Sequence, residues 1–279
     1  MDTNNITVSK TTAGIPVIVD EVPGSRSAGF MISVATGSRD ETEGIYGLSH
    51  LLEHTVFRET STRDSFQMAK EIEGAGGELN AFTGREMTAF FGVTIKETAD
   101  VAKSIVGDIV ADPLINEKDT ELEKKIVLQE LSMLKEEPES YIHDVFMMEM
   151  WRGHELSQDE GGDPALVARM THRDLRAYYD EKYRIPNLAV YATGAVDVDS
   201  TVAWAEETLD GMGGGKRNVR KAPPVPKAGY KFVANEAEHY HIAMGLPAYA
   251  PSDKRKTTAK MLSAILGMGT SSRLFQNVR

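Results

Sequence analysis

Hydrophobic and polar residues near the start of the chain alternate or cluster as they do in β-strands. β-Branched residues at Ile6–Val8 and Ile15–Val19 flank a turn and predict a hairpin, and Phe30–Ala35 predicts a further strand. Glu78–Phe82 and Thr88–Ile95 predict a second hairpin. The chain is therefore expected to open with strands.

The middle of the chain follows the helical period of about 3.6 residues. A helix is expected to begin near Gly47. Helical spacing predicts further helices over Ser65–Gly74, Thr98–Val110, Glu117–Lys135, Tyr141–Trp151 and Thr171–Tyr183. Asn187–Gly194 then returns to a strand pattern.

This order of elements predicts an α+β fold, in which a mainly antiparallel sheet has helices packed on one face. We expect this domain to span residues 1–215 and a linker to span residues 216–229, because the stretch Gly211–Gly229 is rich in glycine, proline and basic residues. The basic residues of the linker are interpreted as a solvated charge run: Lys216, Arg217, Arg220 and Lys221.

Residues 230–279 predict the beginning of a second domain that duplicates the first. A strand over His241–Leu246 and a helix over Thr257–Leu266 repeat the early strand-to-helix order. So short a segment without cysteines buries too little surface to fold alone. We therefore expect the second domain to be incomplete.

The composition of the chain restricts its possible partners and metal ligands. The formal net charge of −11 argues against nucleic acid as a partner, because phosphate binding needs clustered cations. With no cysteine in the 279 residues, any zinc must be held by histidine and carboxylate ligands. The polar first ten residues lack a signal-peptide pattern and no apolar run is long enough to span a membrane, so a cytoplasmic protein is expected.

The pentapeptide His50-Leu51-Leu52-Glu53-His54 is the strongest candidate for a functional site. In a helix, His50 and His54 lie on one face and can bind one metal ion, with Glu53 beside them as a general base. The alternative is that both histidines are ordinary helix residues while the leucines pack inward. The pattern arises by chance in about 2% of chains of this length.

A catalytic zinc site needs a third protein ligand. The predicted helix over Glu117–Lys135 places Glu123 and Glu130 seven residues apart, on the side that carries Ile126, Val127 and Leu134. A carboxylate among apolar residues is costly unless it is paired or binds a metal. Both glutamates are therefore candidates.

At this point the chain resembles the pitrilysin or insulinase-like zinc metallopeptidases, which include the mitochondrial processing peptidase. The family carries a glutamate ligand 76 residues after the last histidine of the motif and another acidic residue seven positions before that ligand, which correspond here to Glu130 and Glu123. The resemblance extends over most of the chain, through residues 76–83, 183–194 and 266–275.

The resemblance implies one zinc ion per chain, held by His50, His54 and Glu130, with Glu53 as the general base. It implies that Glu123 orients a ligand histidine from outside the metal site. By the same resemblance, Asn80, Ala81 and Phe82 would belong to an edge strand to which a substrate peptide adds as an extra strand.

We therefore expect a zinc-dependent endopeptidase that cleaves extended peptides or unstructured polypeptides. The alternative is a non-catalytic scaffold or assembly subunit of a heteromeric complex, a role that the fold also serves. Because the family's second domain continues beyond the equivalent of Arg279, a homologous or complementary peptidase chain is expected to complete the chamber.

Overall fold

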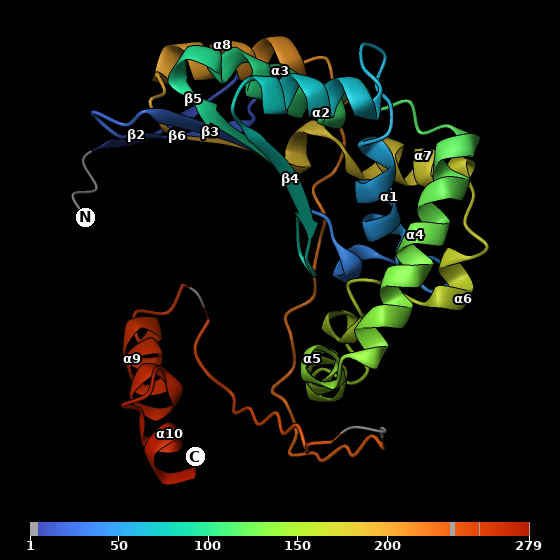
Figure 1. Ribbon diagram of the computed structural model, residues 1–279, viewed down its shortest axis with the longest axis vertical. Helices are drawn as coiled ribbons and strands as arrows, with labels where there is room; N and C mark the ends of the chain where they lie inside the picture. The colour runs from blue at the N-terminus through green and yellow to red at the C-terminus, as the bar shows by residue number, and fades with distance from the viewer. Residues whose placement is uncertain (1–4, 235–237, 251, 279) are drawn as a thin grey trace.

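A single six-stranded sheet organises residues 5–215, here called the N-terminal region (Figure 1). The computed structural model describes residues 5–234, 238–250 and 252–278. The strand order is β1-β2-β6-β3-β5-β4, and the strands are β1 (Ile6–Lys10), β2 (Pro16–Glu21), β3 (Ser27–Val34), β4 (Glu78–Thr83), β5 (Thr88–Ile95) and β6 (Leu188–Gly194). Only β2 and β6 pair in parallel, so the prediction of a mainly antiparallel sheet is confirmed.

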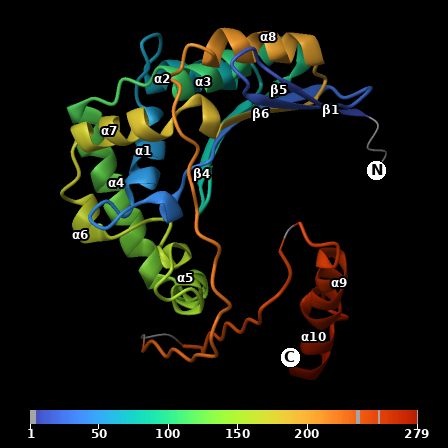
Figure 2. The same ribbon diagram turned by 180° about the vertical axis from the view of Figure 1, so that it is seen from behind.

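The helices form two groups (Figures 1 and 2). One group covers a face of the sheet: α2 (Ser65–Gly74), α3 (Ala99–Ala111) and α8 (Val198–Leu209). The other group lies beside the β4 end of the sheet: α1 (Leu48–Val56), α4 (Glu117–Glu136), α5 (Pro138–Met150), α6 (Pro164–Val167) and α7 (His172–Lys182). Short 3-10 helices span Ser38–Asp40, Lys96–Thr98, Glu155–Ser157 and Ile185–Asn187. The expected packing of helices on one face is confirmed.

The core lies between the sheet and its covering helices. Phe30 and Ile32 of β3 are buried on the face that α3 covers, where Ile105 and Ile109 are also fully buried. Burial of such side chains contributes roughly 1.5–3 kcal/mol each. The alternation of buried and more exposed residues along β3 is therefore the direct result of having helices on only one side.

Strand β4 forms an edge of the sheet. Its one partner strand among the described residues is β5, with Asn80 opposite Phe91 and Ala81 opposite Phe90. An edge strand leaves every second backbone N–H and C=O without a partner in the sheet. The structure thus confirms the edge position expected for Asn80 and Ala81, and it places this edge toward α1.

Contrary to the expectation, not all of the basic residues in the linker are solvated. Lys216 and Arg217 are exposed, but Arg220 forms an ion pair with the nearly buried Asp40, 2.6 Å away, and donates to the Ala35 carbonyl oxygen. Asn218 donates its side-chain N–H to the same carbonyl oxygen at 2.7 Å. The expectation was wrong for Arg220, because the linker lies against the N-terminal region and meets a buried carboxylate there.

The C-terminal region, here the described residues from 216 to 278, contains α9 (Lys256–Gly267) and α10 (Arg273–Val278). Both helices lie apart from the sheet in both views (Figures 1 and 2). The predicted helix over Thr257–Leu266 is confirmed. The predicted strand over His241–Leu246 is wrong: the described residues 238–250 contain no strand, since this segment has no neighbouring strand to pair with.

The expected division at residues 215 and 230 stays a prediction, and its outer units include residues 1–4, 235–237, 251 and 279, which lie outside the described part of the chain. Within the described residues, no helix is long and apolar enough to cross a membrane. The cytoplasmic location also stays a prediction.

Candidate metal centre

Helix α1 positions the two motif histidines. Leu48, Leu51 and Leu52 are at most 1% exposed and anchor the helix in the core. His50 and His54 lie on the opposite, partly exposed face, as their spacing of four residues requires. The apolar side of the helix therefore fixes the direction in which both imidazoles point.

Three ligand-type atoms from α1 and α4 converge. The Nε2 atoms of His50 and His54 are 3.2 Å apart, and the nearest carboxylate oxygen of Glu130 lies 3.9 Å and 3.5 Å from them, respectively. Tetrahedral zinc with bonds of about 2.1 Å requires ligand atoms about 3.4 Å apart. The three separations bracket this value, so the donor set fits zinc in both chemistry and spacing.

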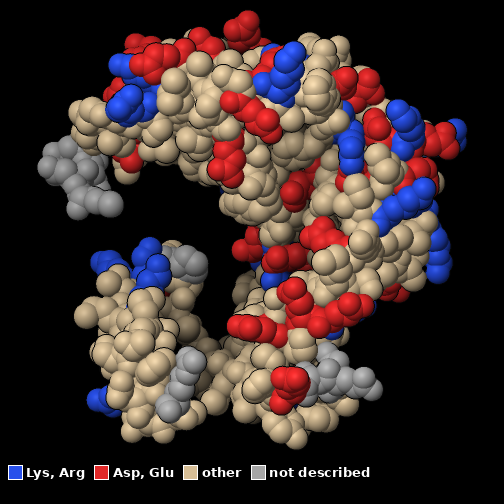
Figure 3. Space-filling model, in the orientation of Figure 1, with Lys and Arg blue, Asp and Glu red and all other residues tan. Residues whose placement is uncertain are grey.

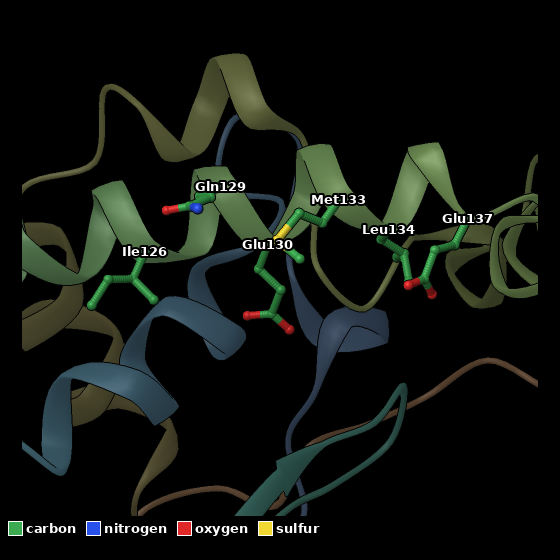
Figure 4. A pocket seen from close by; sticks show the side chains of 6 residues that line it. All are labelled: Ile126, Gln129, Glu130, Met133, Leu134 and Glu137. Atoms are coloured by element: carbon green, nitrogen blue, oxygen red, sulfur yellow. The ribbon is translucent and has the colours of Figure 1, made fainter.

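Glu130 completes this triangle from α4. In Figure 4 its side chain points away from α4 toward α1. The side chain is 54% exposed, and Ile126 beside it is 38% exposed. The expectation that Glu130 lies among buried apolar residues was wrong: the buried stripe of α4 runs through Glu123, Val127 and Leu131, and Glu130 lies next to that stripe.

Glu123 lies behind His54. One of its carboxylate oxygens is 3.0 Å from Nδ1 of His54, and the other accepts a hydrogen bond from Nε of Arg58. Burial by itself raises the pKa of Glu123, but the hydrogen bonds from His54 and Arg58 and their charges outweigh it and lower the pKa. Ionised Glu123 thereby holds the proton of His54 on Nδ1 and leaves Nε2 free to bind a metal.

Glu53 lies on α1 between the two histidines and faces the edge strand. The hydroxyl of Thr83, the last residue of β4, donates a hydrogen bond to Oε2 of Glu53. Burial raises the pKa of Glu53, and the opposing effects of Thr83 and His54 do not cancel this rise. A carboxylate whose pKa moves toward neutrality is suited both to accept and to release a proton.

The two histidines have different environments. Burial and the neighbouring His54 lower the pKa of His50, whereas Glu130 and Asp159 raise it less. Burial also acts to lower the pKa of His54, but its hydrogen bond to Glu123 and the surrounding carboxylates raise it overall. Acidic side chains gather on the surface where α4 and α5 lie (Figure 3). This part of the surface favours a cation.

Two residues contact the site without having been expected there: Thr83 beside Glu53 and Arg58 beside Glu123. Thr83 was expected only as part of residues 76–83, which resemble the family, and no pattern in the sequence singled out Arg58. Thr83 belongs to a strand whose distance from α1 depends on the fold, so no local signal could reveal its contact. Arg58 follows His54 by four residues, which offered a weak signal for a contact on the same side of α1.

Comparison with protein families assigns the fold. Residues 17–162 match the family described as insulinase, peptidase family M16, and residues 169–279 match the M16 inactive domain. The first match covers more than half of the chain. The chain belongs to peptidase family M16. The M16 match to residues 17–162 includes both histidines and Glu130.

Relatives of this M16 chain include proteins named as uncharacterized zinc proteases. One from Streptomyces coelicolor is 31% identical, over 98% of this chain and 62% of the relative. Another from Mycobacterium leprae is 32% identical, over 98% of this chain and 63% of the relative. The M16 chain thus spans somewhat less than two thirds of the length of these relatives.

Solved structures share the M16 fold. An M16 inactive domain from Pseudomonas fluorescens superposes with a TM-score of 0.84 at 17% identity, over 99% of this chain and 68% of the other. Pitrilysin superposes with a TM-score of 0.70 at 20% identity, over 80% of this chain and 25% of the other. At such identities the likeness establishes the fold.

Proposed function

We propose that this chain is the metal-binding part of a zinc-dependent endopeptidase that cleaves extended peptides. The observation that carries the proposal is the convergence of His50, His54 and Glu130 next to Glu53. The names of the relatives as zinc proteases support it. In this proposal each chain binds one zinc ion.

The proposed ligands are His50, His54 and Glu130, with Glu123 orienting His54. Three protein ligands leave a fourth position open, as catalytic zinc sites require. Zinc in such a site polarises a carbonyl group and lowers the pKa of water to about 7. The exposed position of Glu130 leaves this centre accessible from solvent.

Glu53 is the proposed general base. It takes a proton from the attacking water as the water oxygen bonds to the peptide carbonyl carbon, and it delivers that proton to the nitrogen of the departing amine. The peptide C–N bond breaks, leaving an amine and a carboxylic acid, which then ionises by releasing its proton to solvent. The hydrogen bond from Thr83 holds the Glu53 carboxylate in place for both transfers.

The proposed substrate site is the edge of β4, at Asn80, Ala81 and Phe82. A peptide adding there as an extra strand would be bound through its backbone, which favours extended chains of varied sequence. The Phe82 side chain is 43% exposed, and Thr83 at the end of the same strand contacts Glu53. One strand therefore joins the proposed binding edge to the proposed base.

A groove beside Glu130 offers a place for a substrate side chain. It has a volume of about 300 Å³ and runs along α4 past Met133 and Leu134 (Figure 4). Its lining is largely apolar apart from Gln129, Glu130 and Glu137. We assign this groove to an apolar side chain of the bound peptide.

Two variants test the function and separate it from a scaffold role. His54→Ala is expected to abolish stoichiometric zinc binding, measured by elemental analysis after dialysis. Glu53→Gln is expected to keep zinc and to reduce cleavage of an unstructured fluorogenic peptide by at least about 100-fold. Glu73→Gln, on the exposed side of α2, is the matched control and should change neither. Zinc-free wild-type protein, or unchanged cleavage by Glu53→Gln, would refute the proposal.

A homologous or complementary chain is the proposed partner that completes the peptidase chamber. The support is that α9 has no buried residue and exposes Met261 and Leu262, apolar side chains that a partner surface would cover. Native mass measurement should show the chain with a second polypeptide, and adding that polypeptide should raise cleavage. Full activity of the isolated chain would contradict the need for a partner.

A further inference from the structure

The N-terminus of α1 lacks an ordinary cap. Its N-cap residue is Gly47, which adopts a left-handed φ of 102°. Glycine has no side chain that could accept hydrogen bonds from the free N–H groups of the first turn. These groups belong to the helix that carries both proposed histidine ligands. Some other group must satisfy them, because the first turn is buried.

Glu41 accepts these hydrogen bonds, although it lies several residues before the helix in the sequence. Its Oε2 accepts from Gly47 N–H at 2.8 Å, and its Oε1 accepts from Ser49 N–H at 2.7 Å. Glu41 is only 5% exposed, although it follows a short 3-10 helix on the other side of a loop. A carboxylate at this position also interacts favourably with the positive end of the helix dipole.

Two further contacts fix the same turn. The Ser49 hydroxyl is 2.8 Å from the hydroxyl of Tyr178 on α7, which is 3.1 Å from the hydroxyl of Thr36, two residues after the end of β3. On another side, Gly47 lies directly against Gly162: a Cβ added at Gly162 would come within 2.1 Å of the Gly47 Cα atom. The first turn of α1 is thus held by the sheet, by α7 and by the loop before α6.

We propose that Glu41 is a positioning residue for the metal centre, which sets the place of α1 relative to α4 by binding the backbone of the turn that carries His50. The proposal rests on the zinc site proposed above. Its physical basis is that His50 and His54 share α1, whereas Glu130 comes from α4. A shift of α1 would therefore move two ligand atoms together and change both of their distances to the third.

Glu41→Gln tests the proposal, because the amide has only one acceptor oxygen for two N–H groups. We expect it to raise the zinc dissociation constant at least about 10-fold, the range found for residues that orient metal ligands from outside the site. The kcat for peptide cleavage should fall while KM stays the same, since Glu41 lies away from the β4 edge. Glu43→Gln, an exposed carboxylate in the same loop, should change none of these.

Tyr178→Phe provides a milder variant, in case Glu41→Gln does not fold. It keeps the ring and removes only the hydroxyl that contacts Ser49 and Thr36. Zinc binding should weaken about 3-fold, because only one of the two hydrogen bonds that are lost, the one to Ser49, reaches α1. Folded variants that retain the wild-type zinc dissociation constant would overturn the positioning role and leave Glu41 as a purely structural cap.

Amide hydrogen exchange in the metal-free protein separates this inference from the proposed function. Glu41→Gln should accelerate exchange at Gly47 and Ser49 relative to Glu43→Gln, whether or not the wild-type protein binds zinc. Absence of zinc in the wild type would refute the proposed function. Unchanged exchange at these two amides would show that Glu41 does not hold the first turn of α1, and it would refute the positioning role.

Discussion

The N-terminal and C-terminal regions differ in what their helices pack against. In α1, six of the nine residues are buried, whereas α9 has no buried residue and exposes Met261 and Leu262 by 63% and 57%. Both helices have apolar residues at helical spacing. An apolar pattern at helical spacing therefore suffices to form a helix, while burial of its apolar face needs a partner surface that the described C-terminal region does not supply.

The largest expected contrast comes from truncating a leucine in each helix. Leu51→Ala in α1 should lower the free energy of unfolding by about 2–5 kcal/mol, because it leaves a cavity in a packed core. Leu262→Ala in α9 should lower it by less than about 0.5 kcal/mol. Urea denaturation of both variants measures the contrast. Equal losses would show that α9 buries its apolar face in solution.

The next effect is the change of folding stability with pH that Glu41 should cause. Burial raises the pKa of Glu41 to about 7, against the lowering effect of the Ser49 and Gly47 N–H groups, and nearby Asp40 raises it further. Tyr178, whose pKa burial also raises, stays neutral below pH 8. Between about pH 4.5 and 7 the folded protein binds the extra proton, so its stability should fall as pH rises.

Glu41→Gln should remove this component, which amounts to about 3 kcal/mol across that pH range. The measurement is the difference in unfolding free energy between wild type and variant at pH 4.5 and pH 7.5, with a chelator present. Titration of His54, Glu123 and other groups cancels in this difference. Glu43→Gln should retain the wild-type slope, and parallel curves for Glu41→Gln would contradict the assignment.

A smaller effect on stability is expected from the contact between the linker and the N-terminal region. Arg220→Ala should lower the free energy of unfolding by about 1–3 kcal/mol, because it leaves nearly buried Asp40 without its cation. Arg217→Ala, in the same linker but exposed, should change stability by less than about 0.5 kcal/mol. Thermal unfolding of the two variants compares them. Similar midpoints would mean that the linker is not docked in solution.

The smallest effect concerns helix caps. Thr171 caps α7 reciprocally with Asp174, whereas Arg255 at the start of α9 makes no side-chain cap. Thr171→Ala should cost about 1 kcal/mol of stability. Arg255→Ala should have almost no effect on the cooperative unfolding transition. A comparable loss in both would indicate that α9 unfolds together with the sheet.

Much of the N-terminal region followed from local patterns. The two hairpins and the helices over Ser65–Gly74 and Glu117–Lys135 are confirmed within one or two residues. Helix α8 was missed. The predicted strand over His241–Leu246 failed, since a strand depends on a neighbour that local sequence does not reveal.

The candidate site also contains features that local sequence predicts and contacts that depend on the fold. The spacing of His50 and His54 places both on one helical face by local geometry alone, and resemblance to the family pointed to Glu130. The structure brings these residues together, and their roles stay a proposal. The bonds from Thr83 to Glu53 and from Arg58 to Glu123 join segments that only the fold places in contact.

Local patterns were enough to predict the hairpins, the main helices and the shared face of the two histidines, because these depend on backbone periods that repeat within a few residues. No local pattern could predict that Glu41 caps α1, that Arg220 forms an ion pair with Asp40 or that Glu130 is exposed opposite the histidines. The physical reason is that a buried polar group is satisfied by whichever partner the packing of distant elements brings within about 3 Å.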